Sequence, residues 1–179
     1  MYISYKYFAE YEADIRRQFK LKCELSEEAL HRKMFIKGTR NSVAVHIRRG
    51  DYVTVNRSTL CMDYYKKAMS LFEEKLEKPI FLFFCEDINW VKNWFGENDR
   101  YFYMEPGVTD IEEFYLMQQC ENAIIADSTF SWWAAWLNKH ENKIIVSPRD
   151  DVGNRIPDDW IQLEAVAINV DENSEYDYK

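Results

Sequence analysis

The chain has 179 residues, a length typical of one domain that buries a sizeable core without disulfides or a structural metal. Hydrophobic residues make up 47% and charged residues 30%, which excludes a disordered chain, and the apolar runs are too short to cross a bilayer. The 31 acidic residues outnumber the 23 lysines and arginines, and the resulting net charge of −8 argues against nonspecific binding to nucleic acid.

Helical spacing dominates the start of the chain. Apolar side chains recur at intervals of one, three or four between residues 5 and 20, which predicts a helix there. Ser26 and the two glutamates that follow it are typical of a helix start, so a second helix is predicted near 27–36. We interpret 1–38 as a helical segment that precedes the main domain.

From residue 42 onward, short apolar strands alternate with amphipathic helices. The predicted strands cover 42–48, 80–85, 101–104, 122–126 and 143–147. The predicted helices cover 62–77, 87–95, 110–120 and 129–139. This alternation predicts an α/β fold, a Rossmann-like parallel sheet with right-handed crossovers and helices on both faces. We expect this domain to cover 39–170 and the acidic tail at 171–179 to be disordered.

The ends of the predicted strands are where a ligand site is expected. In doubly wound sheets, ligands bind beyond the carboxyl ends of the strands. The chain has only 5 glycines and lacks both the Walker A loop and the G-x-G-x-x-G fingerprint. A phosphate group would therefore have to be bound by side chains or by a helix N-terminus.

The first strand ends in His46, followed after one residue by Arg48, Arg49, Gly50 and Asp51. A guanidinium binds phosphate oxygens through two parallel N–H groups. Because neighbouring side chains of an extended segment point to opposite sides, one arginine would face a given pocket and the other would pair with Asp51 or support the loop. An exposed turn with a local ion pair explains these residues equally well, and His46 alone is typical of a half-buried histidine whose hydrogen bonds are satisfied.

The strand at 122–126 is followed by Ser128, Thr129 and Ser131 at the start of a helix. One of the hydroxyls would cap this helix, and the unpaired N–H groups of its first turn would form an anion site without a glycine loop. The alternative is that Ser128 is only a cap and that the neighbouring tryptophans are only part of the core.

Carboxylates follow the second strand, at Glu86 and Asp87, and open the helix at 110–120, at Asp110, Glu112 and Glu113. One of them could accept the two adjacent N–H donors of a guanine edge. The alternative is that they are acids favoured by the dipole in the first turn of a helix.

The four cysteines, Cys23, Cys61, Cys85 and Cys120, have no metal-ligand spacing, so the sequence predicts reduced thiols and no metal site. The first residues show no secretion signal. We therefore expect a cytoplasmic protein, with at most a peripheral contact to the inner face of the membrane.

Four segments together resemble the α1,2-fucosyltransferase family of glycosyltransferases, which uses GDP-fucose. They are VHIRRGDYV (45–53), FLFFCEDINWVKNWF (81–95), FYLMQQCENAIIADSTFSWWAAWLN (114–138) and KIIVSPRDD (143–151). The pairing of HxRRGDY with STFSWW at this spacing is specific, whereas either motif alone is only suggestive.

The resemblance implies the donor-binding half of a two-domain GT-B-type transferase that is inverting and needs neither metal nor cofactor. Such an enzyme moves L-fucose from GDP-fucose to the 2-hydroxyl of a galactoside, here in bacterial surface glycan synthesis. Arg48 would hold the leaving diphosphate, and Glu113, where the family has aspartate, would contact guanine. The implied donor-binding residues are His46, Arg48, Arg49, Asp51, Glu113, Ser128, Thr129 and Ser131.

The sequence departs from the family pattern in its first part and in single residues. The glycine-rich N-terminal segment of the family and its acceptor-side region are absent, and Asp127 stands where the family has asparagine. A second hypothesis is therefore a GDP-sugar-binding module, or an inactive remnant, without transfer activity. A third is an unrelated α/β domain. The sequence predicts GDP-fucose and a galactoside glycan as partners and gives no oligomeric state.

Overall fold

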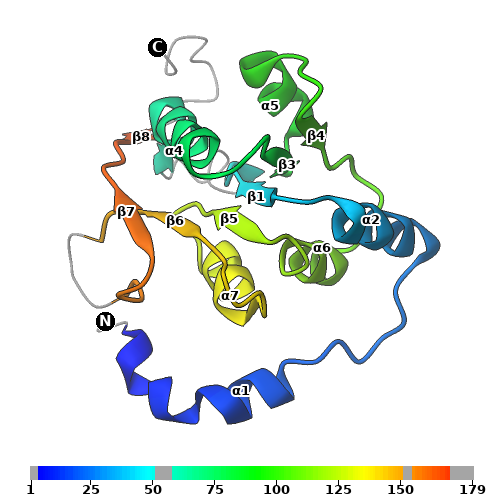
Figure 1. Cartoon of the computed structure of the whole chain (residues 1–179), viewed down its shortest axis with the longest axis vertical. Helices are drawn as coiled ribbons and strands as arrows, with labels where there is room; N and C mark the ends of the chain where they lie inside the picture. The colour runs from blue at the N-terminus through cyan, green and yellow to red at the C-terminus, as the bar shows by residue number, and fades with distance from the viewer. Residues whose placement is uncertain (1–3, 51–57, 151–154, 170–179) are drawn as a thin grey trace.

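The computed structural model describes residues 4–50, 58–150 and 155–169 (Figure 1). At its centre is a six-stranded sheet in which every neighbouring pair of strands is parallel, in the order β4-β3-β1-β5-β6-β7. Its strands are β1 (Ser42–His46), β3 (Ile80–Phe84), β4 (Tyr101–Tyr103), β5 (Asn122–Ile124), β6 (Ile145–Pro148) and β7 (Ile161–Leu163).

The strand order identifies the fold. The chain begins in the middle of the sheet at β1, adds β3 and β4 on one side, and then returns to add β5, β6 and β7 on the other. This is the order of the doubly wound Rossmann fold, in which the reversal creates a switch point between the first and fourth strands of the sheet. The predicted Rossmann-like fold class is confirmed, and its switch point lies between β1 and β5.

Helices cover both faces of the sheet (Figure 1). The helices α4 (Met62–Lys75) and α5 (Ile88–Phe95) pack on one face, and α2 (Glu27–Gly38), α6 (Asp110–Met117) and α7 (Thr129–Leu137) pack on the other. The side chains of β3 alternate between the two resulting cores: Phe81 and Phe83 join the first, and Leu82 and Phe84 the second. Because helices cover both faces of the sheet, β3 is apolar on both of its faces, as the sequence predicts.

Three short strands were not predicted. Besides β7, a separate antiparallel pair forms between β2 (Ser58–Leu60) and β8 (Ala167–Asn169). Each of these strands has three residues, too few to show the alternation by which a strand is detected in a sequence. The strand β7 forms because its backbone pairs with β6, through Val146 opposite Ile161.

The N-terminal segment is less regular than predicted. The single helix expected over residues 5–20 is instead two 3-10 turns, at Tyr5–Tyr7 and Ala9–Tyr11, followed by α1 (Glu12–Gln18). None of the residues in these three elements is buried, so the core supplies little packing to stabilise one continuous helix. The segment is held instead by Phe8, whose ring stacks on that of Trp133 in α7 with 5.2 Å between the ring centres.

The structure bears on only some of the predictions about domain boundaries, cysteines and membrane crossing. The boundary between 1–38 and 39–170 stays a prediction, and the tail at 171–179 lies outside the described residues. All four cysteines are free. Within the ranges described above, every helix falls short of the length and apolarity that a bilayer crossing requires.

One buried hydroxyl ties a helix to the two central strands that lead to the ligand edge. Tyr64 of α4 donates a hydrogen bond to the carbonyl oxygen of Ile125 at 2.8 Å, and its oxygen lies 3.3 Å from that of Val146. Burial raises the pKa of Tyr64 well above 10, so the hydroxyl stays protonated and donates.

We expect Tyr64→Phe to lower the free energy of unfolding by about 1–2 kcal/mol, because a buried carbonyl loses its donor. Urea denaturation measures this change. The control is Tyr115→Phe, since no hydrogen bond involves the Tyr115 hydroxyl within the described ranges. Equal changes in the two variants would contradict the role of the Tyr64 hydrogen bond.

Candidate functional site

Two of the predicted segments meet at the switch point of the sheet. The strands β1 and β5 are direct neighbours, with Val45 opposite Ile124, so the residues that follow them lie side by side at the carboxyl edge. The ring centres of His46 and Phe130 are 5.6 Å apart, which joins the end of β1 to the first turn of α7. The structure therefore places the two specific motifs at one edge.

His46 is buried there in an unusual state. Its side chain is only 3% exposed, and burial together with the nearby Arg48 charge lowers its pKa to about 3, so the imidazole is neutral. Its Nδ1 atom is buried without a hydrogen-bond partner in the described part of the chain. The interpretation of His46 as a histidine with satisfied hydrogen bonds is therefore wrong for Nδ1.

Arg48 interacts electrostatically with two carboxylates that come from different elements. Its guanidinium forms an ion pair with Glu86, which follows β3, and 27% of the Arg48 side chain is exposed. Burial, Glu86 and Asp110 raise the pKa of Glu113 to about 7, and the Arg48 charge is among those that oppose the rise. The structure thus brings Arg48 and Glu113 to the same edge, as predicted.

A hydrogen-bonded glutamate fixes the helix that carries Glu113. The carboxylate of Glu112 accepts hydrogen bonds from the backbone N–H groups of Ser26, at 2.6 Å, and Thr109, at 2.8 Å, and these lower its pKa to about 2. Thr109 and Glu112 form a capping box, which the T-x-x-E spacing already indicates in the sequence. The interpretation of Glu112 as a first-turn acid is confirmed.

Arg49 packs against the start of α5, and the loop that the sequence expected one arginine to support lies largely outside the described residues. Its guanidinium carbon lies 3.8 Å from the ring centre of Trp90, and its Nε atom is 3.5 Å from the Asp87 carboxylate. Asp87 also caps α5 by accepting from the N–H of Trp90. Asp51, the other candidate partner, lies outside the described residues. Arg48 is therefore the better placed of the two arginines to face a ligand.

The start of α7 supplies donors and hydroxyls at the same edge. Ser128 is the N-cap residue, but its side chain makes no capping hydrogen bond. Thr129 is exposed beside it, whereas Ser131 is fully buried. The Ser131 hydroxyl donates toward the carbonyl oxygens of Ser128, at 3.2 Å, and Ala126, at 3.4 Å, so it stabilises the turn from within. Contact of these three residues with a ligand stays a prediction.

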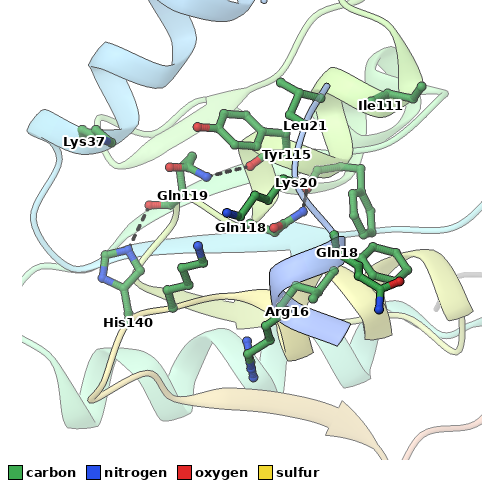
Figure 2. Close-up of a pocket in the computed structure, with 14 residues that line it drawn as sticks. Arg16, Gln18, Lys20, Leu21, Lys37, Ile111, Tyr115, Gln118, Gln119 and His140 are labelled. Carbon is green, nitrogen blue, oxygen red and sulfur yellow. Dashed lines mark hydrogen bonds between the residues drawn. The ribbon is translucent and has the colours of Figure 1, made fainter. Parts of the chain in front are cut away.

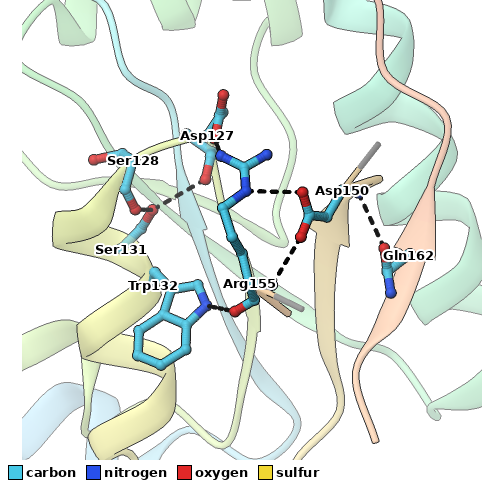
Figure 3. A network of polar contacts seen from close by, with 8 residues as sticks. Asp127, Ser128, Ser131, Trp132, Asp150, Arg155 and Gln162 are labelled. Atoms are coloured by element: carbon cyan, nitrogen blue, oxygen red, sulfur yellow. Dashed lines mark hydrogen bonds and ion pairs between the residues drawn. The ribbon is translucent and has the colours of Figure 1, made fainter. Parts of the chain in front are cut away.

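Arg155 joins Asp127 to Asp150 in a charge network that sequence reasoning missed (Figure 3). Arg155 lies 3.7 Å from the Asp127 carboxylate, and its Nε atom donates to Asp150 at 2.8 Å. The indole N–H of Trp132 donates to the carbonyl oxygen of Arg155 at 3.0 Å, which links the network to α7. No motif marks Arg155, because its partners are brought to it only by the fold.

No metal site accompanies these groups in the part of the chain that the structure describes: nowhere in it do three or more His, Cys, Asp or Glu side chains form a cluster that could hold an ion. The charges at this edge include the Arg48 guanidinium and the carboxylates of Glu86, Asp87 and Glu113. Arg48 can exchange its carboxylate partner for an anionic ligand, and the first turn of α7 can add N–H donors.

Comparisons with known proteins agree with this arrangement. A family model described as "Glycosyl transferase family 11" matches residues 2–156. "O-antigen biosynthesis glycosyltransferase WbnK" of Escherichia coli is 37% identical over 135 residues, which cover 69% of this chain and 45% of that protein. "Alpha-1,2-colitosyltransferase" of Escherichia coli is 31% identical over 175 residues, 89% of this chain and 59% of that protein. Human "Galactoside alpha-(1,2)-fucosyltransferase 1" is 31% identical over 148 residues, 75% of this chain and 40% of that protein.

The chain spans about half the length of these curated relatives. The family match extends over most of the chain and includes both motifs at the switch point, the one after β1 and the one that opens α7. The resemblance to α1,2-fucosyltransferases is thereby confirmed, and the chain belongs to glycosyl transferase family 11.

Proposed function

We propose that this chain binds GDP-fucose at the carboxyl edge of its sheet and transfers L-fucose to the 2-hydroxyl of a galactoside, with inversion and without a metal. The observation that carries the proposal is the convergence of Arg48 and the first turn of α7 at the β1/β5 switch point. Both are suited to an anionic diphosphate, one through a charged fork of donors and the other through N–H groups. The names of the relatives support fucose and galactoside as the substrates.

The chemistry requires positive charge at the leaving group. When the bond between the fucose anomeric carbon and the phosphate oxygen breaks, positive charge builds on the sugar and negative charge on GDP. Arg48 and the N–H groups of α7 would stabilise the departing diphosphate, and their fixed positions avoid the cost of reorganisation. The acceptor hydroxyl attacks from the opposite face of the sugar, which inverts the configuration, and its proton passes to a general base to which no residue of this chain is assigned.

Glu113 would recognise the base in this proposal. An ionised carboxylate accepts the two adjacent N–H donors of guanine, and such donors favour the charged form. Binding of GDP would therefore lower the pKa of Glu113 from its value of about 7. Arg48 would at the same time exchange its ion pair with Glu86 for the diphosphate.

The test has a binding arm and a transfer arm. We expect GDP to bind in calorimetry, and incubation with GDP-fucose, a β-galactoside and EDTA to yield a fucosylated disaccharide. Release of free fucose without a disaccharide would favour the alternative of a binding module without transfer activity. A need for added Mg²⁺ after EDTA treatment would refute the metal-independent mechanism, and no binding of millimolar GDP to folded protein would refute both functions.

We expect Asp127→Asn to strengthen GDP binding about two- to fivefold, because it removes a mostly exposed negative charge beside the proposed diphosphate position. Calorimetry measures the change. The control is Asp63→Asn, an exposed acid of α4 on the other side of the sheet. If Asp127→Asn weakens binding instead, the carboxylate serves the site by holding Arg155.

A further inference from the structure

A groove beside the N-terminal segment has a lining different from that of the proposed GDP site. It is a groove of about 880 Å³ between residues 16–21 of the N-terminal segment and the helices α6 and α7 (Figure 2). Phe114, Tyr115 and Gln118 line it from α6, and Leu137 from the end of α7. None of the described residues proposed to bind GDP-fucose lines it. Its volume lies in the range of small-molecule sites, about 300–1,000 Å³.

The charge of this groove is opposite to that of the whole chain. Four cationic side chains line it, from Arg16, Lys20, Lys37 and Lys139, and none of its fourteen lining residues, all in the described part, is acidic. The chain as a whole carries a net charge of −8. None of the three lysines forms an ion pair with another described residue, so their charges remain available to an anion. Like-signed charges around a concave surface focus the field on an anionic ligand.

The groove is lined by both cationic and apolar side chains. Lys37, Gln119 and His140 lie on one side of the view in Figure 2, and Leu21 and Ile111 lie on the other. Lys139 precedes His140 directly, so it belongs to the polar side. A ligand that contacts both kinds of side chain would combine an anionic group with an apolar body.

We propose that this groove binds an amphipathic phosphate, a phosphate or diphosphate ester of a hydrocarbon chain. Its phosphate contacts Lys37 and Lys139, since ammonium groups are suited to phosphate oxygens. Its hydrocarbon chain lies along Leu21 and Ile111 and removes their apolar surface from water. The exposed Ile111, 61% accessible at the start of α6, gains cover from such a ligand.

The test titrates the full chain with dodecyl phosphate below its micelle concentration. Inorganic phosphate tests the head alone, and dodecyl maltoside tests a neutral amphiphile. We expect saturable binding of one dodecyl phosphate per chain, with affinity at least tenfold above that for either comparison ligand. GDP should not compete, and Arg48→Ala should bind dodecyl phosphate as the wild type does.

Two variants test the two sides of the groove separately. The double variant Lys37→Ala, Lys139→Ala should weaken dodecyl phosphate binding by about tenfold or more, because two charge-assisted contacts are lost. Ile111→Glu should weaken it by about fivefold or more without disturbing the fold, since Ile111 is exposed. The matched control is Lys75→Ala, because Lys75 occupies the last turn of α4 as Lys37 does that of α2.

Three results would overturn the proposal. The first is absence of saturable dodecyl phosphate binding to folded protein. The second is an affinity for inorganic phosphate equal to that for dodecyl phosphate, which would show that the apolar side chains do not contribute to binding. The third is a loss in Lys75→Ala as large as in the double variant, which would show that only general positive charge matters.

Discussion

Arg48→Ala is expected to weaken GDP binding by about a hundredfold, because two charge-assisted hydrogen bonds to the diphosphate are lost. The rate of fucose transfer should fall by at least the same factor, since the same guanidinium would stabilise the negative charge of the leaving group. Arg48→Lys should recover only part of the affinity, because an ammonium group lacks the planar fork of donors. Calorimetry with GDP measures the binding loss directly.

The matched control is Arg40→Ala, an exposed arginine at the amino end of β1, whereas Arg48 follows its carboxyl end. The Arg48–Glu86 ion pair is partly exposed, so its loss should change the free energy of unfolding by no more than about 1 kcal/mol. Equal losses of GDP affinity in the two alanine variants would contradict the phosphate role of Arg48.

Glu113→Gln is expected to stabilise the protein above pH 7 while it impairs the proposed site. The folded chain holds the pKa of Glu113 at about 7, above the ordinary value of 4.5 that applies after unfolding. Between these values the folded state binds more protons, so this group lowers the free energy of unfolding as the pH rises through that window. The full shift corresponds to roughly 3 kcal/mol, and partial exposure reduces the expected gain for Glu113→Gln at pH 8 to about 1–2 kcal/mol.

Urea denaturation at pH 4 and pH 8 measures this gain, which should be present at pH 8 and close to zero at pH 4. Glu74→Gln, at an exposed glutamate of α4, is the control and should show no gain at either pH. A gain in Glu113→Gln of the same size at both values would contradict the ionisation account.

The same carboxyl group should make GDP binding depend on pH. Only the ionised form accepts both guanine N–H groups, so affinity should rise about tenfold between pH 6 and pH 8 from this group. Ionisation of the GDP phosphates changes the affinity in the same direction. The Glu113→Gln variant measures the pH dependence that comes from the phosphates alone. An identical pH slope in wild type and Glu113→Gln would exclude Glu113 from base recognition.

The fold was predictable because its signals are local. The run 80–85 is apolar on both faces, and in the structure Phe81 and Leu82 enter different cores, as a doubly covered parallel strand requires. The order of strands and helices along the chain then leaves few topologies. The prediction of one continuous N-terminal helix was wrong, because helical spacing in a segment without buried residues does not guarantee a continuous helix.

The sequence predicted where the site residues lie better than it predicted their ion pairs and protonation. Strand ends predicted where His46, Arg48 and Ser128 would lie, since the edge of a parallel sheet gathers them. The Arg48–Glu86 and Asp127–Arg155 ion pairs, by contrast, join residues that are far apart in the sequence. Such pairs, like the burial that neutralises His46, follow from packing between elements, and no spacing in the sequence encodes them.

The most direct test of the central claim is a map of GDP binding by the backbone amide NMR signals of the full chain. The proposed function predicts the largest shift changes in residues 46–50, which follow β1, and 126–131, which open α7, with a further change at Glu113. Arg48→Ala should abolish these changes at the same GDP concentration. Largest changes at the groove residues 16–21 and 137–140, or none at the β1/β5 edge, would contradict the claim that this edge binds the nucleotide.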